Sequence, residues 1–199
     1  MSDDIASRMR MTEEKAPIFW YLTVFHEAGH AVAALRSDYP VNEIYIDPND
    51  GFVDKGTHDD NEAEKFIVSA GPWAEARAIR VIAGVDGEDG FTDLWRSLFR
   101  KNKDDWRMYH EALGHEVSEA DSVKARESYF FPDTSPPSYE DLPGGGWDAF
   151  PADFWDEVRD LAMMMLEALD DLEVGHGQPP LQRIEPMRWR KPGWIPDNS

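Results

Sequence analysis

Apolar residues at helical spacing dominate this chain of 199 residues. Between Pro17 and Ser37 they lie on nearly every helical face, which predicts a helix buried on all sides. In residues 61–83 they form one stripe, which predicts a second helix that Pro72 should kink or split. Further helices are predicted from about Thr92 towards Leu113, near residues 116–130, and over residues 152–174, where Gly175 ends the last one.

A short segment after the first predicted helix has a different pattern. Residues 41–46 alternate in polarity and are rich in β-branched and aromatic side chains, which predicts a strand. Residues 48–51 have the composition of a turn, and Phe52 and Val53 begin a possible return strand. The fold class that we expect is therefore mainly α (α+β), a helical domain with a small β-strand pair.

Composition along the chain predicts one domain with an extension at each end. Residues 1–16 are polar and are expected to be flexible, residues 17–175 form the domain, and residues 176–199 form a C-terminal extension. Within the domain, residues 132–151 carry five prolines and three consecutive glycines, which indicates an irregular insertion or a lid. The extension is basic around residues 183–191, and we expect it to dock on the acidic body.

Charge and composition exclude several classes of partner. A net charge of −20 argues against nucleic acid, because phosphates would be repelled by most of this surface. The sequence contains no run of about 18 uncharged apolar residues, so no membrane span is predicted. The first residues lack a signal-peptide pattern. We therefore expect a cytoplasmic protein without a membrane partner. Because the chain has no cysteine, a zinc ion would need histidine and carboxylate ligands.

The most informative chemistry lies inside the first predicted helix, in the sequence His26-Glu27-Ala28-Gly29-His30. Histidines four residues apart lie on the same face of a helix, so both rings can bind one tetrahedral ion. Glu27 is rotated by about 100°, towards the open coordination position, where it can act as general base. The alternative of two hydrogen-bonded core histidines leaves Glu27 unexplained. The pattern predicts a zinc-dependent hydrolase.

A similar sequence, from His110 to His115, has one residue more. Residues five apart are rotated by about 140° on a helix, so their rings would not converge on one ion. We interpret both as surface histidines.

A catalytic zinc ion needs three protein ligands and one open position. The third ligand must come from elsewhere in the chain, and the candidates are carboxylates. Glu75 lies in the second predicted helix, and Asp93 follows a glycine-bearing loop. Composition and spacing do not choose between them.

Residues 26–32, His-Glu-Ala-Gly-His-Ala-Val, resemble the start of the peptidase domain of FtsH-type zinc metallopeptidases. Residues 70–76 resemble the later GGRxAEE helix of that family, and residues 90–94 resemble its loop with a zinc-binding aspartate. The resemblance covers most of residues 17–100, and residues 152–174 less specifically. It implies a helical, zincin-like peptidase domain. Its implied site has His26, His30 and Asp93 as Zn²⁺ ligands, Glu27 as general base, and Glu75 as a supporting residue or alternative ligand.

The same resemblance implies an ATP-independent metalloendopeptidase that acts on a peptide or protein substrate. The implied substrate-binding strand consists of Glu43, Ile44, Tyr45 and Ile46, which would hold an extended peptide by strand addition. Pro72 and Trp73 replace the family's Gly-Arg, and residues 101–151 have no counterpart. We expect a stand-alone domain, without the ATPase module and membrane anchor of that family.

Two other functions fit the sequence. ImmA/IrrE-type metallopeptidases are also small, carry the same five-residue motif and cleave one regulatory partner, but their third ligand is a glutamate, which would select Glu75. The second alternative is a catalytically silent zinc-binding interaction domain, against which Glu27 argues. The substrate and the oligomeric state are not specified by the sequence.

Overall fold

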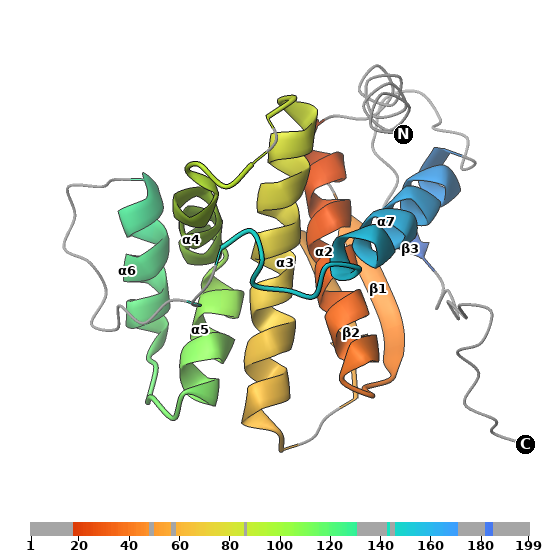
Figure 1. Cartoon of the computed structure of the whole chain (residues 1–199). Coiled ribbons are helices and arrows are strands. Elements are labelled where there is room, and N and C mark those ends of the chain that lie inside the picture. The colour runs from red at the N-terminus through yellow and green to blue at the C-terminus, as the bar shows by residue number, and fades with distance from the viewer. Residues whose placement is uncertain are drawn as a thin grey trace, which may run out of the picture.

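The computed structural model describes residues 18–47, 50–56, 59–85, 87–130, 143, 146–170 and 182–184. The predicted flexible segment 1–16 lies outside the described residues, as does most of the predicted extension 176–199. Two long helices, α2 (Ile18–Arg36) and α3 (Asn61–Ile82), lie side by side at the centre (Figure 1). The remaining helices are α4 (Phe91–Lys101), α5 (Lys103–Ala112), α6 (Glu119–Phe130) and α7 (Phe154–Asp170).

The predicted fold class is confirmed: the described chain is mainly helical with a small antiparallel sheet. Helix α3 begins after Asp60, whose carboxylate accepts hydrogen bonds from the backbone N–H groups of Glu62 and Ala63, 2.9 and 3.1 Å away. The helix continues through Pro72, so the predicted split does not occur. Residues 67–76 are all buried, and we infer that this packing outweighs the loss of one backbone donor.

The sheet has three strands in the order β2-β1-β3. Strands β1 (Val41–Asp47) and β2 (Asp50–Lys55) form the predicted hairpin. On the other side of β1, β3 (Gln182–Ile184) pairs antiparallel with Ile44, Tyr45 and Ile46. Three residues of the predicted C-terminal extension therefore join the sheet, and β1 has a hydrogen-bonded neighbour on both sides.

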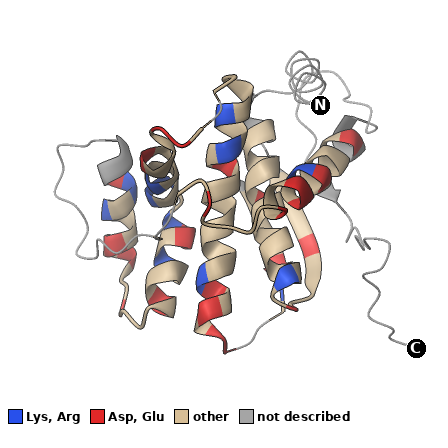
Figure 2. Cartoon of the chain, viewed as in Figure 1, with Lys and Arg blue, Asp and Glu red and all other residues tan. Residues whose placement is uncertain are grey.

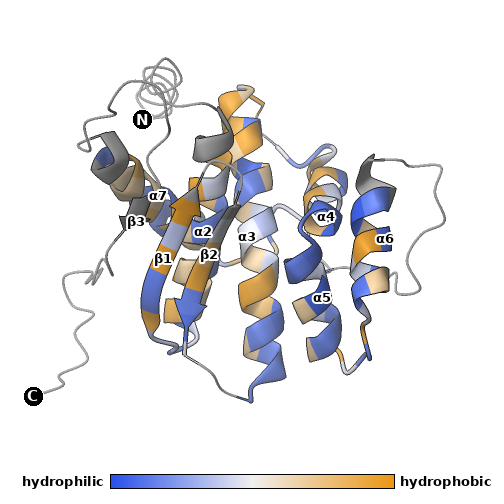
Figure 3. Cartoon of the chain, turned by 180° about the vertical axis from the view of Figure 1, so that it is seen from behind, coloured by the Kyte–Doolittle hydropathy of each residue, from blue (hydrophilic) through white to orange (hydrophobic). Residues whose placement is uncertain are grey.

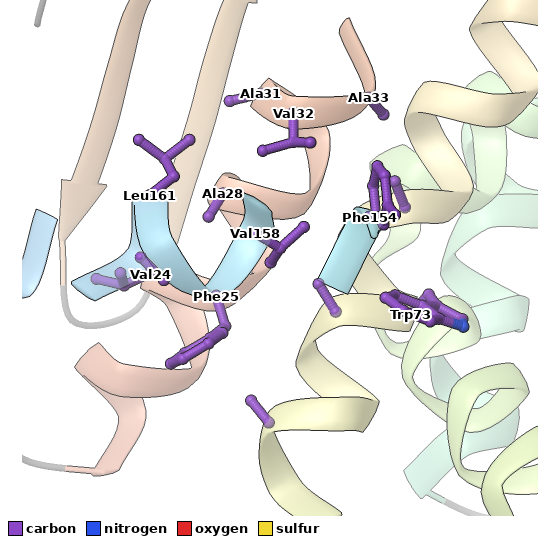
Figure 4. Close-up of a cluster of buried hydrophobic side chains, with 14 of the residues drawn as sticks. Val24, Phe25, Ala28, Ala31, Val32, Ala33, Trp73, Phe154, Val158 and Leu161 are labelled. Atoms are coloured by element: carbon purple, nitrogen blue, oxygen red, sulfur yellow. The ribbon is translucent and has the colours of Figure 1, made fainter. Parts of the chain in front are cut away.

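Helix α2 lies between the sheet and α7, which explains why its apolar residues lie on nearly every helical face. Figure 3 shows the hairpin on one side of α2, and Figure 1 shows α7 crossing the opposite side. In the core, Phe25 and Val32 of α2 and Val158 of α7 are fully or almost fully buried (Figure 4). Burial of each such side chain stabilises the fold by about 1.5–3 kcal/mol.

Helices α2 and α3 approach each other closely at Gly29. A Cβ atom at this position would lie 2.6 Å from the carbonyl oxygen of Ala70 and 2.8 Å from the Cβ of Ala74. No residue but glycine fits here without moving α3. This crossing brings the middle of α3 against the two histidines of α2.

A second, smaller hydrophobic cluster lies beyond α3. Its buried members are Phe99 of α4, Trp106 of α5 and Ala125 of α6, and Tyr109 and Val117 pack against it. Among the described residues, neither α5 nor α6 contributes a side chain to the main core, whereas α4 contributes to both clusters. Helices α5 and α6 therefore pack around this second cluster, while α5 also lies against α3 and α6 against α4.

The described end of the predicted insertion is irregular, as expected, but it is fixed to the core. The indole N–H of Trp73 donates to the carbonyl of Gly146 at 3.1 Å, and the guanidinium of Arg77 lies 3.9 Å from the centre of the Trp147 ring. Phe150 is buried among these side chains. This arrangement anchors residues 146–150 on α3. The remainder of the possible lid lies outside the described residues, apart from Pro143.

Acidic residues lie along α7, on α6 and at the start of α3 (Figure 2). Within the part of the chain that is described, no helix has both the length and the apolar composition that a membrane crossing needs.

Candidate metal centre

Two histidines of α2 and one aspartate of α5 converge at the centre of the molecule. The Nε2 atoms of His26 and His30 are 3.0 Å apart. The carboxylate of Asp105 faces both rings, with Oδ2 3.0 Å from Nε2 of His26 and Oδ1 3.2 Å from Nε2 of His30. Each histidine is 8% exposed, so the group is largely shielded from solvent. These are the atoms that a metal ion would contact.

The aspartate at the centre is not the one that the sequence predicted. Asp93 is exposed in the first turn of α4 and does not belong to the cluster. Asp105 lies in the first turn of α5, after the chain changes direction at Asn102. Its neighbour Trp106 is completely buried in the small cluster and fixes that turn. Among the described residues the structure therefore brings Asp105, and not the predicted Asp93, to the two histidines.

A hydrogen bond at Nδ1, the ring nitrogen that faces away from Asp105, orients each histidine. Nδ1 of His30 donates a hydrogen bond to the carbonyl of Ile67 at 2.8 Å, and Nδ1 of His26 donates to Oε2 of Glu75 at 3.1 Å. Because these acceptors take the Nδ1 protons, both Nε2 atoms are left for the centre. This is the usual support of metal-binding histidines. Glu75 thus contacts Nδ1 of His26, whereas Asp105 faces the Nε2 atoms of both rings.

Glycine makes room for the rings and for the carboxylate of Glu27. A Cβ atom on Gly71 would lie 2.7 Å from Cδ2 of His30 and closer still to Nε2, so any side chain there would displace the ring. A Cβ atom on Gly51 of β2 would lie 2.6 Å from Oε1 of Glu27. Glu27 is 4% exposed and lies directly against this strand. The predicted position of the hairpin beside the site is therefore confirmed.

The prediction that residues 43–46 hold a peptide is not supported by the sheet. Strand β1 is paired on both sides, and Ile44 and Ile46 are buried, so it offers no open edge to a peptide. Glu43 and Tyr45 lie on the same strand. Strand β2 lies against Glu27 at Gly51, and its outer edge has no strand partner among the described residues.

The acid–base properties of the centre follow from its three carboxylates. Burial by itself would lower the pKa of His26, but Asp105, Glu75 and Glu27 raise it well above the usual value. Burial likewise opposes the raised pKa of His30, which comes from Asp105 and Glu27. Burial would raise the pKa of Asp105, yet the two histidines hold it far below its usual range. Without a metal ion, the cluster is therefore stabilised as protonated histidines beside an ionised aspartate.

We expect the metal-free protein to lose stability as the pH rises above about 6.5. The folded pKa values of His26 and His30 are raised, so their stabilisation is complete below the unfolded value of about 6.5 and is lost as the pH rises through the folded values. The depressed pKa of Asp105 affects stability in the acid range. The stabilisation that its ionised carboxylate contributes is present above about pH 4 and is lost as the pH falls through the folded pKa.

Thermal unfolding in chelator, at about pH 6 and about pH 9, measures this effect. A fall in Tm of at least about 3 °C is expected at the higher pH, which corresponds to roughly 1 kcal/mol for a domain of this size. The double variant His26→Gln/His30→Gln should show a clearly smaller fall, because only general charge effects remain. An equal fall in both proteins would contradict the ion-paired arrangement.

The three residues fit a zinc ion. Zinc–ligand bonds of about 2.0–2.1 Å in tetrahedral geometry separate the ligand atoms by about 3.3 Å, and the two Nε2 atoms are 3.0 Å apart. One ligand atom from each of His26, His30 and Asp105 lies within 4.8 Å of the other two. Oδ2 of Asp105 is buried and lies 3.0 Å from Nε2 of His26. This is expected of atoms that point at a common centre. Two imidazoles and one carboxylate leave a fourth position open, as in catalytic zinc sites.

The other histidine pair also differs from the prediction. His110 is fully buried, and its Nδ1 atom is 3.2 Å from Nδ1 of His115. Helix α5 has already ended at Ala112, and Gly114, with φ of +85°, turns the chain back so that the two rings stack. The helical angle between the two positions therefore does not apply. No carboxylate or third histidine among the described residues joins this pair in a ligand group.

The chain matches none of the family models, curated proteins or solved structures with which it was compared. The assignment of the centre therefore depends on its own residues. Of these, the sequence identified His26, Glu27, His30 and Glu75, and it missed Asp105. The only signal for Asp105 was an acidic pair, residues 104 and 105, immediately before a tryptophan.

Proposed function

We propose that this protein is a zinc-dependent metallopeptidase in which His26, His30 and Asp105 hold the ion and Glu27 is the general base. The observation that carries the proposal is the orientation of the two histidines. Each Nδ1 is occupied by a backbone or carboxylate acceptor, and both Nε2 atoms face the carboxylate of Asp105. A pair of ordinary core histidines would need neither two Nε2 atoms that face one carboxylate nor the buried Glu27 beside them.

The nature of the third ligand favours one of the two metallopeptidase types. FtsH-type enzymes use an aspartate and ImmA/IrrE-type enzymes a glutamate, and here the aspartate faces the histidines while Glu75 stands behind one of them. We therefore favour an FtsH-like chemistry, with the aspartate supplied from a later helix than the resemblance implied.

The residues of the centre have distinct tasks in the proposed reaction. Zinc, when bound, would supply a Lewis acid that lowers the pKa of water to about 7 and polarises a peptide carbonyl. Glu27 would accept the proton of the attacking water and pass it to the leaving amine. Contact with the backbone at Gly51 holds its carboxylate in place. Ile67 and Glu75 keep the histidine rings oriented.

We propose an extended peptide as the substrate, added to the outer edge of β2 rather than to β1. Glu27 lies against β2 at Gly51, and backbone pairing along the outer edge would hold a peptide beside the strand that contacts it. The cytoplasmic location and the absence of a nucleic-acid partner stay predictions from the sequence.

The direct test is metal analysis combined with peptide hydrolysis. The purified protein should contain about one zinc ion per chain and should cleave unfolded casein or a peptide library. A chelator should abolish cleavage, and added zinc should restore it. Failure to bind zinc would exclude the proposed centre. Bound zinc without cleavage of any substrate would favour the silent interaction domain.

A further inference from the structure

Glu75, which orients His26, is itself held by a lysine. Nζ of Lys101 lies 3.0 Å from Oε1 of Glu75, while Oε2 of the same carboxylate accepts the hydrogen bond from His26 at 3.1 Å. Glu75 is 3% exposed, whereas the side chain of Lys101 is 38% exposed and reaches inward from the last residue of α4. The three residues form a line from the surface to the centre.

A buried carboxylate such as that of Glu75 needs a cation or several donors, because an uncompensated charge is expensive to bury. Of the described groups, the structure gives it two partners, the ring of His26 and the ammonium of Lys101. Each partner takes one oxygen. Lys101 therefore fixes the rotation of the carboxylate as well as its charge, and Oε2 is left in line with Nδ1 of His26.

The position of Lys101 in the chain links this support to the third ligand. Lys101 ends α4, Asn102 breaks the helix, and Asp105 lies in the first turn of α5. The short segment from Lys101 to Asp105 thus places the proposed ligand Asp105 at the centre and the ammonium of Lys101 beside the carboxylate of Glu75. Without the cation, Glu75 could turn towards the centre, where a carboxylate competes with Asp105 for the same ion.

We propose that Lys101 is a positioning residue of the metal centre. It holds Glu75 in the supporting place, and Glu75 in turn holds His26 with Nε2 directed at the ion. The inference rests on the proposed zinc centre but not on the peptidase reaction. Arg100, one residue earlier, has no contact with the centre among the interactions found in the described residues, and it is a matched control for the loss of one positive charge.

The test compares Lys101→Met, Lys101→Arg and Arg100→Met by zinc competition with a chromophoric chelator and by the visible spectrum of the cobalt-substituted protein. Loss of such a supporting partner typically weakens metal binding by about 10–100-fold, and this is expected for Lys101→Met. Its cobalt spectrum should change, because the ring of His26 loses its fixed orientation. Lys101→Arg and Arg100→Met should stay within about threefold of the wild type, below the range for a lost partner.

The variants Glu75→Gln and Lys101→Met, singly and combined, distinguish the positioning role of Lys101 from a merely structural one. If both act through His26, the double variant should bind zinc no more weakly than the worse single variant. Additive losses, or a Lys101→Met variant with wild-type affinity and spectrum, would overturn the inference. Wild-type protein that binds zinc but cleaves nothing would overturn the proposed reaction and leave the positioning role in place. Wild-type protein that binds no zinc would overturn both.

Discussion

Replacing Glu27 by Gln should abolish peptide hydrolysis while zinc remains bound. The amide has nearly the same shape as the carboxylate, so it fits the space against Gly51, but it cannot accept the proton of the attacking water. General-base catalysis contributes about 10²–10⁴-fold, and we expect a loss in kcat/KM of about a thousandfold. Zinc content measured on the same preparation should stay close to one ion per chain.

The exposed Glu88 provides the matched control, since Glu88→Gln makes the same chemical change outside the centre. Its activity and zinc content should equal those of the wild type. Normal hydrolysis by Glu27→Gln would remove Glu27 from the reaction. Loss of zinc from Glu27→Gln would instead indicate that Glu27 is a ligand or supports one.

The second large effect is expected from Asp105→Asn, paired with Asp93→Asn. The first substitution removes the charged oxygens that face both Nε2 atoms, whereas Asp93 is exposed on another helix. Zinc affinity should fall by more than about a hundredfold in Asp105→Asn, beyond the effect of losing a supporting partner. Asp93→Asn should leave it unchanged. Competition with a chelator of known affinity measures both, and the opposite result would restore Asp93 as the ligand.

Much of the fold followed from short-range patterns in the sequence. The apolar run around the motif predicted a helix enclosed on all sides, and α2 is enclosed by the sheet, α3 and α7. The hairpin followed from alternation and a turn composition within fifteen residues. The convergence of His26 and His30 could be predicted because a four-residue spacing places both rings on one face of a helix.

The remaining parts of the centre depend on tertiary structure. Asp105 reaches the histidines because α4 ends at Lys101 and the chain turns at Asn102, and no local pattern gives the direction of that turn. The pairing of β3 with β1 joins residues far apart in sequence, so no local pattern indicated that both edges of β1 are occupied. The histidines at positions 110 and 115 meet because the helix stops between them, where helical geometry no longer applies.

Helices α5 and α6 share no buried side chain with the main core in the described residues, and they pack around their own small cluster. If the proposed centre holds zinc, the ion joins these two helices to the body through Asp105. Parts of a folded chain can open locally, as contiguous units, without global unfolding. One opening would withdraw a ligand and break the coordination sphere, so retention of the ion and catalytic competence would be governed by the same local unfolding equilibrium. The chain would then be inactivated reversibly, with its main core intact.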